Sequence, residues 1–393
     1  MPAPTAREVG QRIATIRRAR RMTQADLARA AFVSLPMIKA IERGARSPSD
    51  DTLDSISAAL TVDPSRIIAG STRTESRVHA SIPAISAAIA AYDIPADAPA
   101  RPLHELSAAV TQLTTWRLGA QYAQIAEHTP QLLTHVLAAL HHSTGTDRLR
   151  AAQLLAATAR SADAVAYKFG HGDLSARLID LMRWAADQTE DRIARCTAAY
   201  VRTETFFAAR AHAQGLAALE QAIDAAPSPI SRDATAARGA LHMRAAVIAG
   251  RADDPDAAEH HMAEARRLAD GLREGAYDGT QFGPDSVRAH EVSVAVSLGH
   301  DHVRAALDVA EEWTPPDDLP AERRSGFWIE RARAQVWAGQ PDNAFESLKV
   351  ARFIAPQHTR EHPWAREAAA TIRRLKRADA ESLTHFAEWI GAV

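Results

Sequence analysis

The chain has 393 residues, a formal net charge of −2, 46% hydrophobic residues and 5% aromatic residues. This length exceeds a single core of ordinary size, so we expect two domains or an extended repeat array, and the hydrophobic content excludes a disordered chain. The single cysteine, Cys196, excludes a disulfide framework and favours a reducing compartment. No segment of the sequence is long and apolar enough to span a membrane, so we expect a cytoplasmic protein with no membrane contact.

The charge is divided unevenly along the chain. Residues 1–70 hold 11 basic and 7 acidic residues, whereas the remainder holds 35 basic and 41 acidic residues. A basic N-terminal segment followed by an acidic body is typical of a nucleic-acid contact that is confined to one end.

The N-terminal segment predicts five short helices. They are expected at about residues 6–20, from Thr23, from Ser34, at about residues 52–60 and after Pro64. Thr23 and Asp26 have the spacing of an acidic capping box, and Ser34 is a favourable N-cap. Pro36 is tolerated in the first turn of the third helix, and Gly44 is a typical stop signal after it.

Three segments follow one another in register: Thr23-Gln24-x-x-Leu27-Ala28, Val33-Ser34-x-x-x-Ile38 and Ile41-Glu42-x-Gly44. Over about residues 7–70 the chain therefore resembles the helix-turn-helix domain of the lambda/Cro repressor class, also called the xenobiotic-response-element family. The resemblance implies that the second helix crosses the DNA backbone while the third lies in the major groove. It also implies a buried structural ion pair between Arg17 and Glu42.

The resemblance further implies a DNA contact surface around the third helix. Its expected members are Gln24, Ser34, Leu35, Pro36, Met37, Lys39, Ala40, Arg43 and Arg46. Gln24 is expected to donate to a phosphate, and Arg43 and Arg46 are expected to hold phosphates without reading sequence.

The base-reading face departs from the pattern that is common in this family. Leu35, Pro36 and Ala40 can contact only thymine methyl groups, which leaves Lys39 as the side chain able to address guanine. We expect modest direct readout, with much of the specificity coming from DNA shape. The alternative is a domain of this fold that is used for protein contact.

The domain boundary is expected in the polar segment 70–77, which lacks periodicity. A helix should follow to about Ala91, and a proline-rich loop should cover residues 94–102. The expected division is a DNA-binding domain at 1–70, a linker with one helix at 71–102, and a helical-repeat sensor and dimerisation domain at 103–393.

From about residue 103 the sequence predicts helix after helix, with a recurring unit. A helix ends in glycine, a polar turn follows, and a second helix carries alanine about five and twelve residues later. The clearest copy contains Gly339, Ala344, Ala351 and Pro356. Further copies start at Arg210, at Gly250 with Ala257, and at Gly299 with Ala305. The pattern resembles the tetratricopeptide repeat, whose period is roughly 34 residues, and implies an all-α superhelix.

Two further segments interrupt or close this array. The glycines and Pro284 in Gly275–Asp285 forbid helix, which favours an ordinary inter-repeat turn; alternatively, Tyr277 and Phe282 cover one rim of a groove. The last two helices are expected to seal the array with apolar residues. These are Ile372, Leu375, Leu383, Phe386, Trp389 and Ile390.

The order of the two domains resembles that of the bacterial peptide-sensing regulators known as the RRNPP group, which implies a peptide on the concave surface. Such sensors typically clamp the peptide backbone with asparagines, whereas this chain has only Asn343. Counting along the repeat template places four candidate ligand residues on the inner face of the first helices. These are Tyr200, Glu204, Ser293 and Arg333. Alternatively, each is solvated or paired within the array.

Metal and enzyme chemistry find no support in the sequence. Adjacent histidines on a helix point about 100° apart, and His358 and His362 are expected in a loop because Pro363 follows them. There is no phosphate-binding glycine loop and no nucleophile elbow, so we expect neither a cofactor nor catalysis. The sequence predicts a homodimeric, DNA-binding transcriptional regulator that senses a peptide or small molecule. The alternative is a DNA-tethered scaffold whose repeats recruit a protein.

Overall fold

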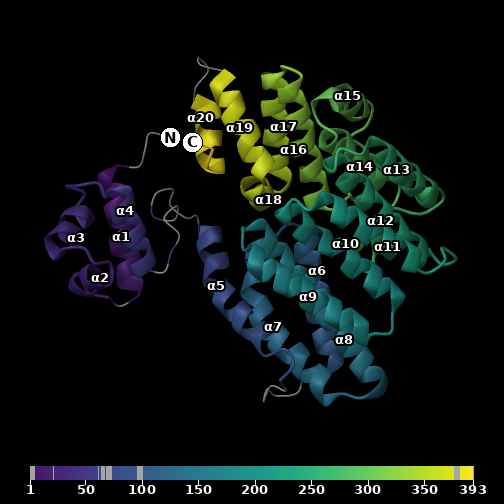
Figure 1. Ribbon diagram of the computed structural model, residues 1–393, viewed down its shortest axis with the longest axis horizontal. Helices are drawn as coiled ribbons and strands as arrows, with labels where there is room; N and C mark the ends of the chain where they lie inside the picture. The colour runs from purple at the N-terminus through teal and green to yellow at the C-terminus, as the bar shows by residue number, and fades with distance from the viewer. Residues whose placement is uncertain are drawn as a thin grey trace. The chain divides into compact units, whose positions relative to one another are not determined.

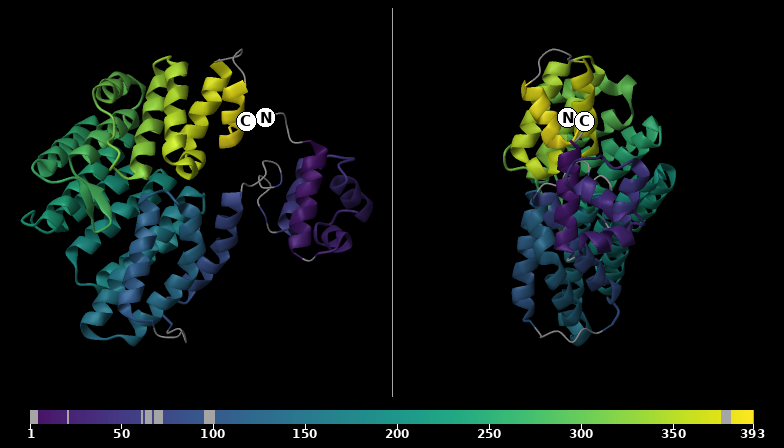
Figure 2. Two further views of the ribbon diagram at one scale, coloured as in Figure 1. Left: turned by 180° about the vertical axis from the view of Figure 1, so that it is seen from behind. Right: turned by 90° about the vertical axis from the view of Figure 1, so that its left-hand side faces the viewer.

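The computed structural model describes residues 5–20, 22–60, 62, 67, 73–94, 101–375 and 381–392. The chain divides into two compact units, residues 1–76 and residues 77–392, which we call the head and the body. Both are built from helices, so the all-α fold class is confirmed, with one short hairpin in the body (Figures 1 and 2). Within the described residues no helix has the length and apolar character that crossing a membrane requires.

Four helices of the head are described. They are α1 (Ala6–Ala19), α2 (Gln24–Ala30), α3 (Leu35–Glu42) and α4 (Asp50–Ala59). The capping box of Thr23 and Asp26 is confirmed, as is Ser34 as the N-cap of α3. Ile13, Leu27 and Ile38 are fully buried in the shared core. The fifth predicted helix, after Pro64, falls on residues of which only Ile67 is described.

The helix α5 (Arg73–Ala90) begins earlier than the sequence predicted. Residues 73–77 were expected to belong to a polar linker, but they form the first turn of this helix. Polar residues without glycine or proline do not oppose helix, so their lack of periodicity was a poor stop signal. Most of the predicted proline-rich loop, residues 95–100, lies outside the described residues.

The body continues with helices joined by short turns. They are α6 (Leu103–Leu118), α7 (Tyr122–His142), α8 (Gly145–Lys168), α9 (Gly172–Gln188), α10 (Arg192–Ala209), α11 (His212–Ala225), α12 (Arg232–Arg251), α13 (Pro255–Ala269), α14 (Pro284–Ser297), α15 (Val303–Glu312), α16 (Ala321–Trp337), α17 (Pro341–Ile354), α18 (Pro356–Glu361), α19 (Pro363–Leu375) and α20 (Glu381–Ile390), with a 3-10 turn at His300–His302. Neighbouring helices in this order pack as pairs, from α8 with α9 to α16 with α17.

A left-handed residue ends the first helix of several pairs, and a small buried residue follows it by five positions. Arg210 has φ 53° and precedes Gly215, and Gly339 has φ 72° and precedes Ala344. Gly250 was placed wrongly, because it lies inside α12 and the left-handed residue is Asp253. In the repeat copies for which the sequence predicted Ala257 and Ala305, the fully buried alanine is one position later in the sequence. These are Ala258 and Ala306.

The segment predicted as an inter-repeat turn is a β-hairpin. Strands β1 (Gly275–Tyr277) and β2 (Thr280–Phe282) pair antiparallel, with Asp278 and Gly279 between them. Both turn residues have positive φ, 46° and 71°, which is the geometry of a tight two-residue hairpin. Phe282 is completely buried. The hairpin therefore packs into the body through β2, and its tip contacts Arg117 of α6 and Arg160 of α8.

The C-terminal helices close the body largely as predicted. Ile372, Leu383, Phe386 and Ile390 are buried in one cluster that spans α16 to α20. Leu375 is the exception: it is the last residue of α19, and 58% of its surface is exposed.

Candidate DNA interface and ligand site

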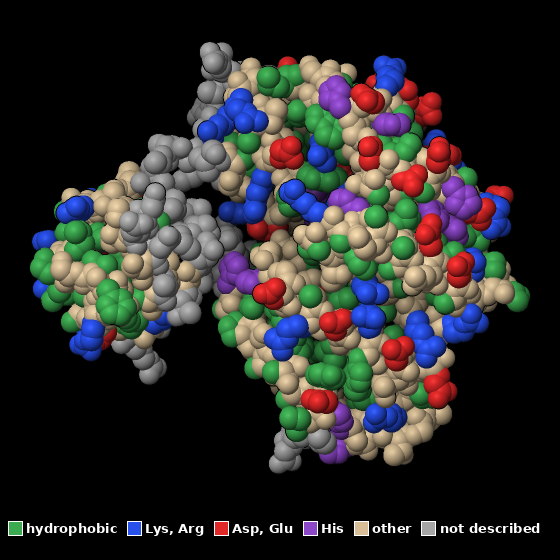
Figure 3. All heavy atoms as spheres, viewed as in Figure 1, with side chains coloured by type: hydrophobic (Ala, Val, Ile, Leu, Met, Phe, Trp, Pro, Cys, Tyr) green, Lys and Arg blue, Asp and Glu red, His purple; other side chains and the backbone are tan. Residues whose placement is uncertain are grey.

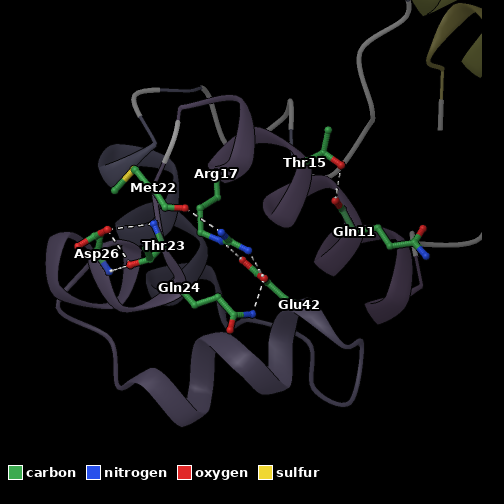
Figure 4. Close-up of polar contacts among 8 residues, drawn as sticks. All are labelled: Gln11, Thr15, Arg17, Met22, Thr23, Gln24, Asp26 and Glu42. Carbon is green, nitrogen blue, oxygen red and sulfur yellow. Dashed lines mark hydrogen bonds and ion pairs between the residues drawn. The ribbon is translucent and has the colours of Figure 1, made fainter.

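Behind α3 the head contains a buried polar network. Arg17 donates through Nε to Glu42 Oε1 at 2.6 Å and through Nη2 to Glu42 Oε2 at 2.9 Å (Figure 4). Arg17 Nη1 also donates to the Met22 carbonyl at 2.8 Å. The predicted ion pair is thus present, and its side chains are only 9% and 5% exposed. This network fixes the C-terminal end of α3 against α1.

Gln24 belongs to the same network. Its Nε2 donates to Glu42 Oε2 at 2.7 Å (Figure 4). Burial would raise the pKa of Glu42, but hydrogen bonds from Arg17 and Gln24 outweigh burial and lower that pKa below its ordinary value. One amide N–H of Gln24 is thereby engaged, and its predicted phosphate contact stays a prediction.

The remaining predicted contact residues differ in exposure along α3 and its flanks. Pro36, Lys39, Arg43 and Arg46 are exposed, as is the capping residue Ser34. The half-buried members are Leu35, Met37 and Ala40, of which Leu35 and Met37 pack against the core of the head. The surface of α3 therefore offers cations at and beyond its C-terminal end and an apolar patch at its start.

Within the body, the sequence-predicted Tyr200 and Glu204 lie one turn apart on α10. Arg244 of α12 reaches both: its guanidinium lies 4.7 Å from the ring centre of Tyr200 and 3.5 Å from Glu204 Oε1. Arg244 Nε also donates to Thr203 Oγ1 at 2.7 Å. These two predicted residues are thus paired within the helical array, which was the alternative that the sequence left open.

Tyr200 lies in a strongly positive environment. Burial by itself would raise the pKa of Tyr200, but the positive charges of Arg244, Arg323 and Arg160 lower that pKa to about 8. These guanidiniums come from three different helices, α12, α16 and α8. The fold therefore concentrates cations around one phenol.

Because of this environment, we expect the folded chain to become more stable at alkaline pH. Tyr200→Phe should remove that gain. The pKa of Tyr200 is about 8 in the folded chain and ordinarily 10, so the folded state releases this proton first and gains stability as pH rises through that window. We expect a contribution on the order of 2 kcal/mol at pH 10, which is lost again as pH falls to 8. Denaturant unfolding of wild type, Tyr200→Phe and the control Tyr277→Phe across this range measures it. Parallel curves for wild type and Tyr200→Phe would refute the assignment.

The other two predicted ligand residues, Ser293 and Arg333, lie near Glu330. Ser293 Oγ donates to Glu330 Oε2, and burial raises the pKa of Glu330 to about 7. The guanidinium of Arg333 stacks on Trp364, 4.2 Å from the ring centre, and Arg251 lies 4.8 Å from the same ring. Two cations thus contact one indole ring.

Sequence reasoning missed much of the charged inner face. Lys168 Nζ lies 3.1 Å from Glu322 Oε1 and 3.2 Å from His358 Nε2. His358 Nδ1 lies 2.7 Å from Ser325 Oγ, so a ring that accepts from Lys168 carries its proton on Nδ1. The prediction of a loop here was wrong, since His358 lies in α18 and is buried. Lys168, one of four lysines in the chain, was the available signal.

We call the connected charged and polar residues around Tyr200 the inner cluster. Its members are Arg117, Arg160, Asp163, Lys168, Tyr200, Glu204, Arg244, His290, Glu322 and Arg323. Five of these are basic and three are carboxyls. Burial and then the charge of Glu204 raise the pKa of Asp163 well above its ordinary value. The cluster therefore carries a net positive charge.

The comparisons with known proteins identify the head. Residues 13–67 match the helix-turn-helix family model, so the N-terminal unit is a helix-turn-helix domain. A search of curated protein sequences found no match to this chain.

Three solved structures are among those similar to this chain. PlcR of Bacillus thuringiensis, in complex with the peptide PapR7 and DNA, is 16% identical, with 67% of this chain and 95% of that chain covered and a TM-score of 0.30. Apo ComR of Streptococcus vestibularis is 12% identical over 90% of this chain and 93% of that one, with a TM-score of 0.25. A PrgX mutant is 10% identical over 97% and 99%, with a TM-score of 0.25.

Proposed function

We propose that this chain is a sequence-specific, DNA-binding transcriptional regulator whose body dimerises and senses an effector. The observation that carries the proposal is the surface of α3 in a helix-turn-helix domain. Lys39, Arg43 and Arg46 are exposed there, while the buried Arg17–Glu42 pair fixes the helix from behind. A helix that is fixed from behind and has exposed cations on its outer side is suited to the major groove.

The contacts of α3 divide into reading and positioning. Lys39 is exposed in the middle of the helix, where an ammonium group reaches guanine N7 and O6. Arg43 and Arg46 follow at the C-terminal end and serve phosphates. Gln24 and Ser34, at the starts of α2 and α3, contact the DNA backbone. The apolar contact with thymine methyl groups is made by Leu35, Pro36, Met37 and Ala40.

The two kinds of contact predict different effects in DNA binding. Lys39→Ala should lower the affinity for the preferred site about tenfold and relax preference over scrambled DNA, because one base contact is lost. Arg43→Ala should weaken both DNAs alike, because a phosphate contact carries no sequence information. Fluorescence anisotropy of the full chain on a site selected from random duplexes measures both. Arg29→Ala, an exposed change on α2, is the control.

The reverse result would overturn this division. If Arg43→Ala changed the ratio of selected to scrambled affinity while Lys39→Ala left it unchanged, the assignment of reader and phosphate clamp would be wrong. If the chain selected no DNA but captured a protein through its body, the scaffold alternative would replace the regulator.

Dimerisation follows from the reading surface of a single head. One such domain buries too little surface for selective binding, and paired heads on half-sites about one helical turn apart supply the rest. We assign dimerisation to the body. Light scattering on the full chain should give twice the monomer mass, and a monomer with and without DNA would refute the dimer.

The effector site is assigned to the inner face of the body, where Tyr200, Glu204, Ser293 and Arg333 lie. These four residues and their partners come from α10, α12, α14, α16 and α19, so a ligand here contacts several helix pairs at once. A ligand that favours one arrangement of these helix pairs shifts the population of body conformations. In the dimer this changes how the two heads are placed on DNA.

A further inference from the structure

The hairpin tip meets two buried arginines. Arg117 Nη2 donates to the Gly279 carbonyl at 2.7 Å, and Arg160 Nη1 donates to the Asp278 carbonyl at 3.1 Å. Each arginine is only 8% exposed. Within the described part of the chain, neither has a carboxylate at ion-pair distance, and Arg117 Nε has no hydrogen-bond partner. The hydrogen bonds that these two buried guanidiniums donate at the hairpin tip are thus accepted by neutral carbonyl oxygens.

This arrangement is electrostatically incomplete. A buried cation is stable when an anion and hydrogen bonds replace its water, and a carbonyl supplies only a partial charge. Burial and the nearby charge of Arg117 lower the pKa of Arg160 to about 9. Across Tyr200, Arg323 donates to the ring of His290 at 3.0 Å, which burial and Arg323 keep neutral by lowering the His290 pKa far below its ordinary value. Asp278, Glu204 and Glu322 act on these guanidiniums only from beyond ion-pair distance, and an anion would supply the direct partner.

The hairpin tip borders solvent. Asp278 at the tip is exposed although the arginines behind it are buried. Its carboxylate accepts from Thr197 Oγ1 at 2.7 Å and so stays beside the arginine pair. In Figure 3, basic, acidic and histidine side chains border a hollow in the surface of the body near α18. The tip therefore stands at the solvent side of the arginine pair.

We propose that Arg117 and Arg160 bind an anionic group of the effector, a carboxylate or a phosphate, which replaces the hairpin-tip carbonyls as their acceptor. This inference rests on the proposed function, because it names the chemistry of the effector in the body. A charged acceptor binds guanidinium more strongly than a carbonyl does, so an anion competes with Asp278 and Gly279. Occupancy thus releases the tip, while Phe282 keeps the base of the hairpin packed in the body.

The test uses the full chain, with inorganic phosphate and citrate as probes in a thermal-shift titration against sodium chloride of equal ionic strength. At least one probe should raise the melting temperature saturably beyond chloride. Arg160→Gln and Arg117→Gln should each weaken the midpoint about tenfold. Asp278→Asn should strengthen it, because a repelling charge is removed. Arg150→Gln, an exposed change on the same α8, should leave it unchanged.

The outcomes separate the parts of the account. A response to citrate alone or to phosphate alone assigns the class of anion. A response equal to that of chloride, or one that Arg160→Gln and Asp278→Asn leave unchanged, overturns the site. DNA anisotropy with saturating probe, beside Arg160→Gln, tests the coupling separately. If the probe binds wild type but the DNA affinity of wild type with probe equals that of Arg160→Gln with probe, the anion site stands. Control of the heads by the effector is then refuted.

Discussion

Replacing Glu42 with alanine should lower the free energy of unfolding of the head by about 3 kcal/mol, because Arg17 stays buried without its partner. Glu42 accepts from both Arg17 and Gln24, and the side chains of the ion pair are almost inaccessible. Hydrogen exchange of the amides in α1 to α3 of the full chain measures the loss. DNA binding should fall with it, because α3 is no longer fixed.

The control for this change is Glu8→Ala, an exposed capping carboxylate on α1. Because Glu8 lies in solvent at the start of α1, its loss should cost much less stability than the loss of Glu42. A second variant, Glu42→Gln, retains the size and hydrogen-bonding capacity and should lie between the two. If Glu42→Ala lost no more protection than Glu8→Ala, the buried network would not be what fixes α3.

The second large effect is expected at the hairpin. Phe282→Ala should destabilise the body by about 4 kcal/mol, because it empties a fully buried aromatic position. Phe282 packs against α12 at Gly239, where a Cβ atom would lie 2.0 Å from the Phe282 ring. Without this anchor the hairpin should detach, and amide exchange at Thr280 and Gln281 should accelerate. Denaturant unfolding together with hydrogen exchange measures both.

Phe353→Ala is the matched control, since Phe353 is 88% exposed and its loss should change stability by about 0.5 kcal/mol or less. If Phe282→Ala destabilised the body as expected while the hairpin amides kept their protection, Glu274 would hold the hairpin by itself. That carboxylate accepts from Gln281 Nε2 at 2.8 Å and from Ser286 Oγ at 2.7 Å.

The head could be predicted in detail because its signals are local. The capping pair Thr23–Asp26, the N-cap Ser34 and the inward Ile38 and Ile41 all lie within a short segment, and the structure contains each of them. Helix ends and core faces depend on such neighbours in sequence.

The hairpin and the inner cluster could not be predicted in this way, because their contacts join distant parts of the chain. Arg117 and Gly279 are 162 residues apart, and Lys168 and His358 are 190 apart. Arg160 and Asp163 stand in an alanine-rich helix that is buried nearly all round, so the pattern of α8 does not distinguish an inner face from an outer one. Tyr200 and Glu204 were found by counting along a repeat, whereas their partner Arg244 was not.

The most direct test of DNA reading is the affinity of the full chain for its selected duplex and for scrambled DNA across a salt series. The proposal predicts tight binding to the selected site and a steep loss of affinity with salt, and Arg43→Ala should reduce the slope by about one. Equal affinity for both duplexes, or affinity that does not change with salt, would contradict the assignment of α3 as a DNA-reading helix.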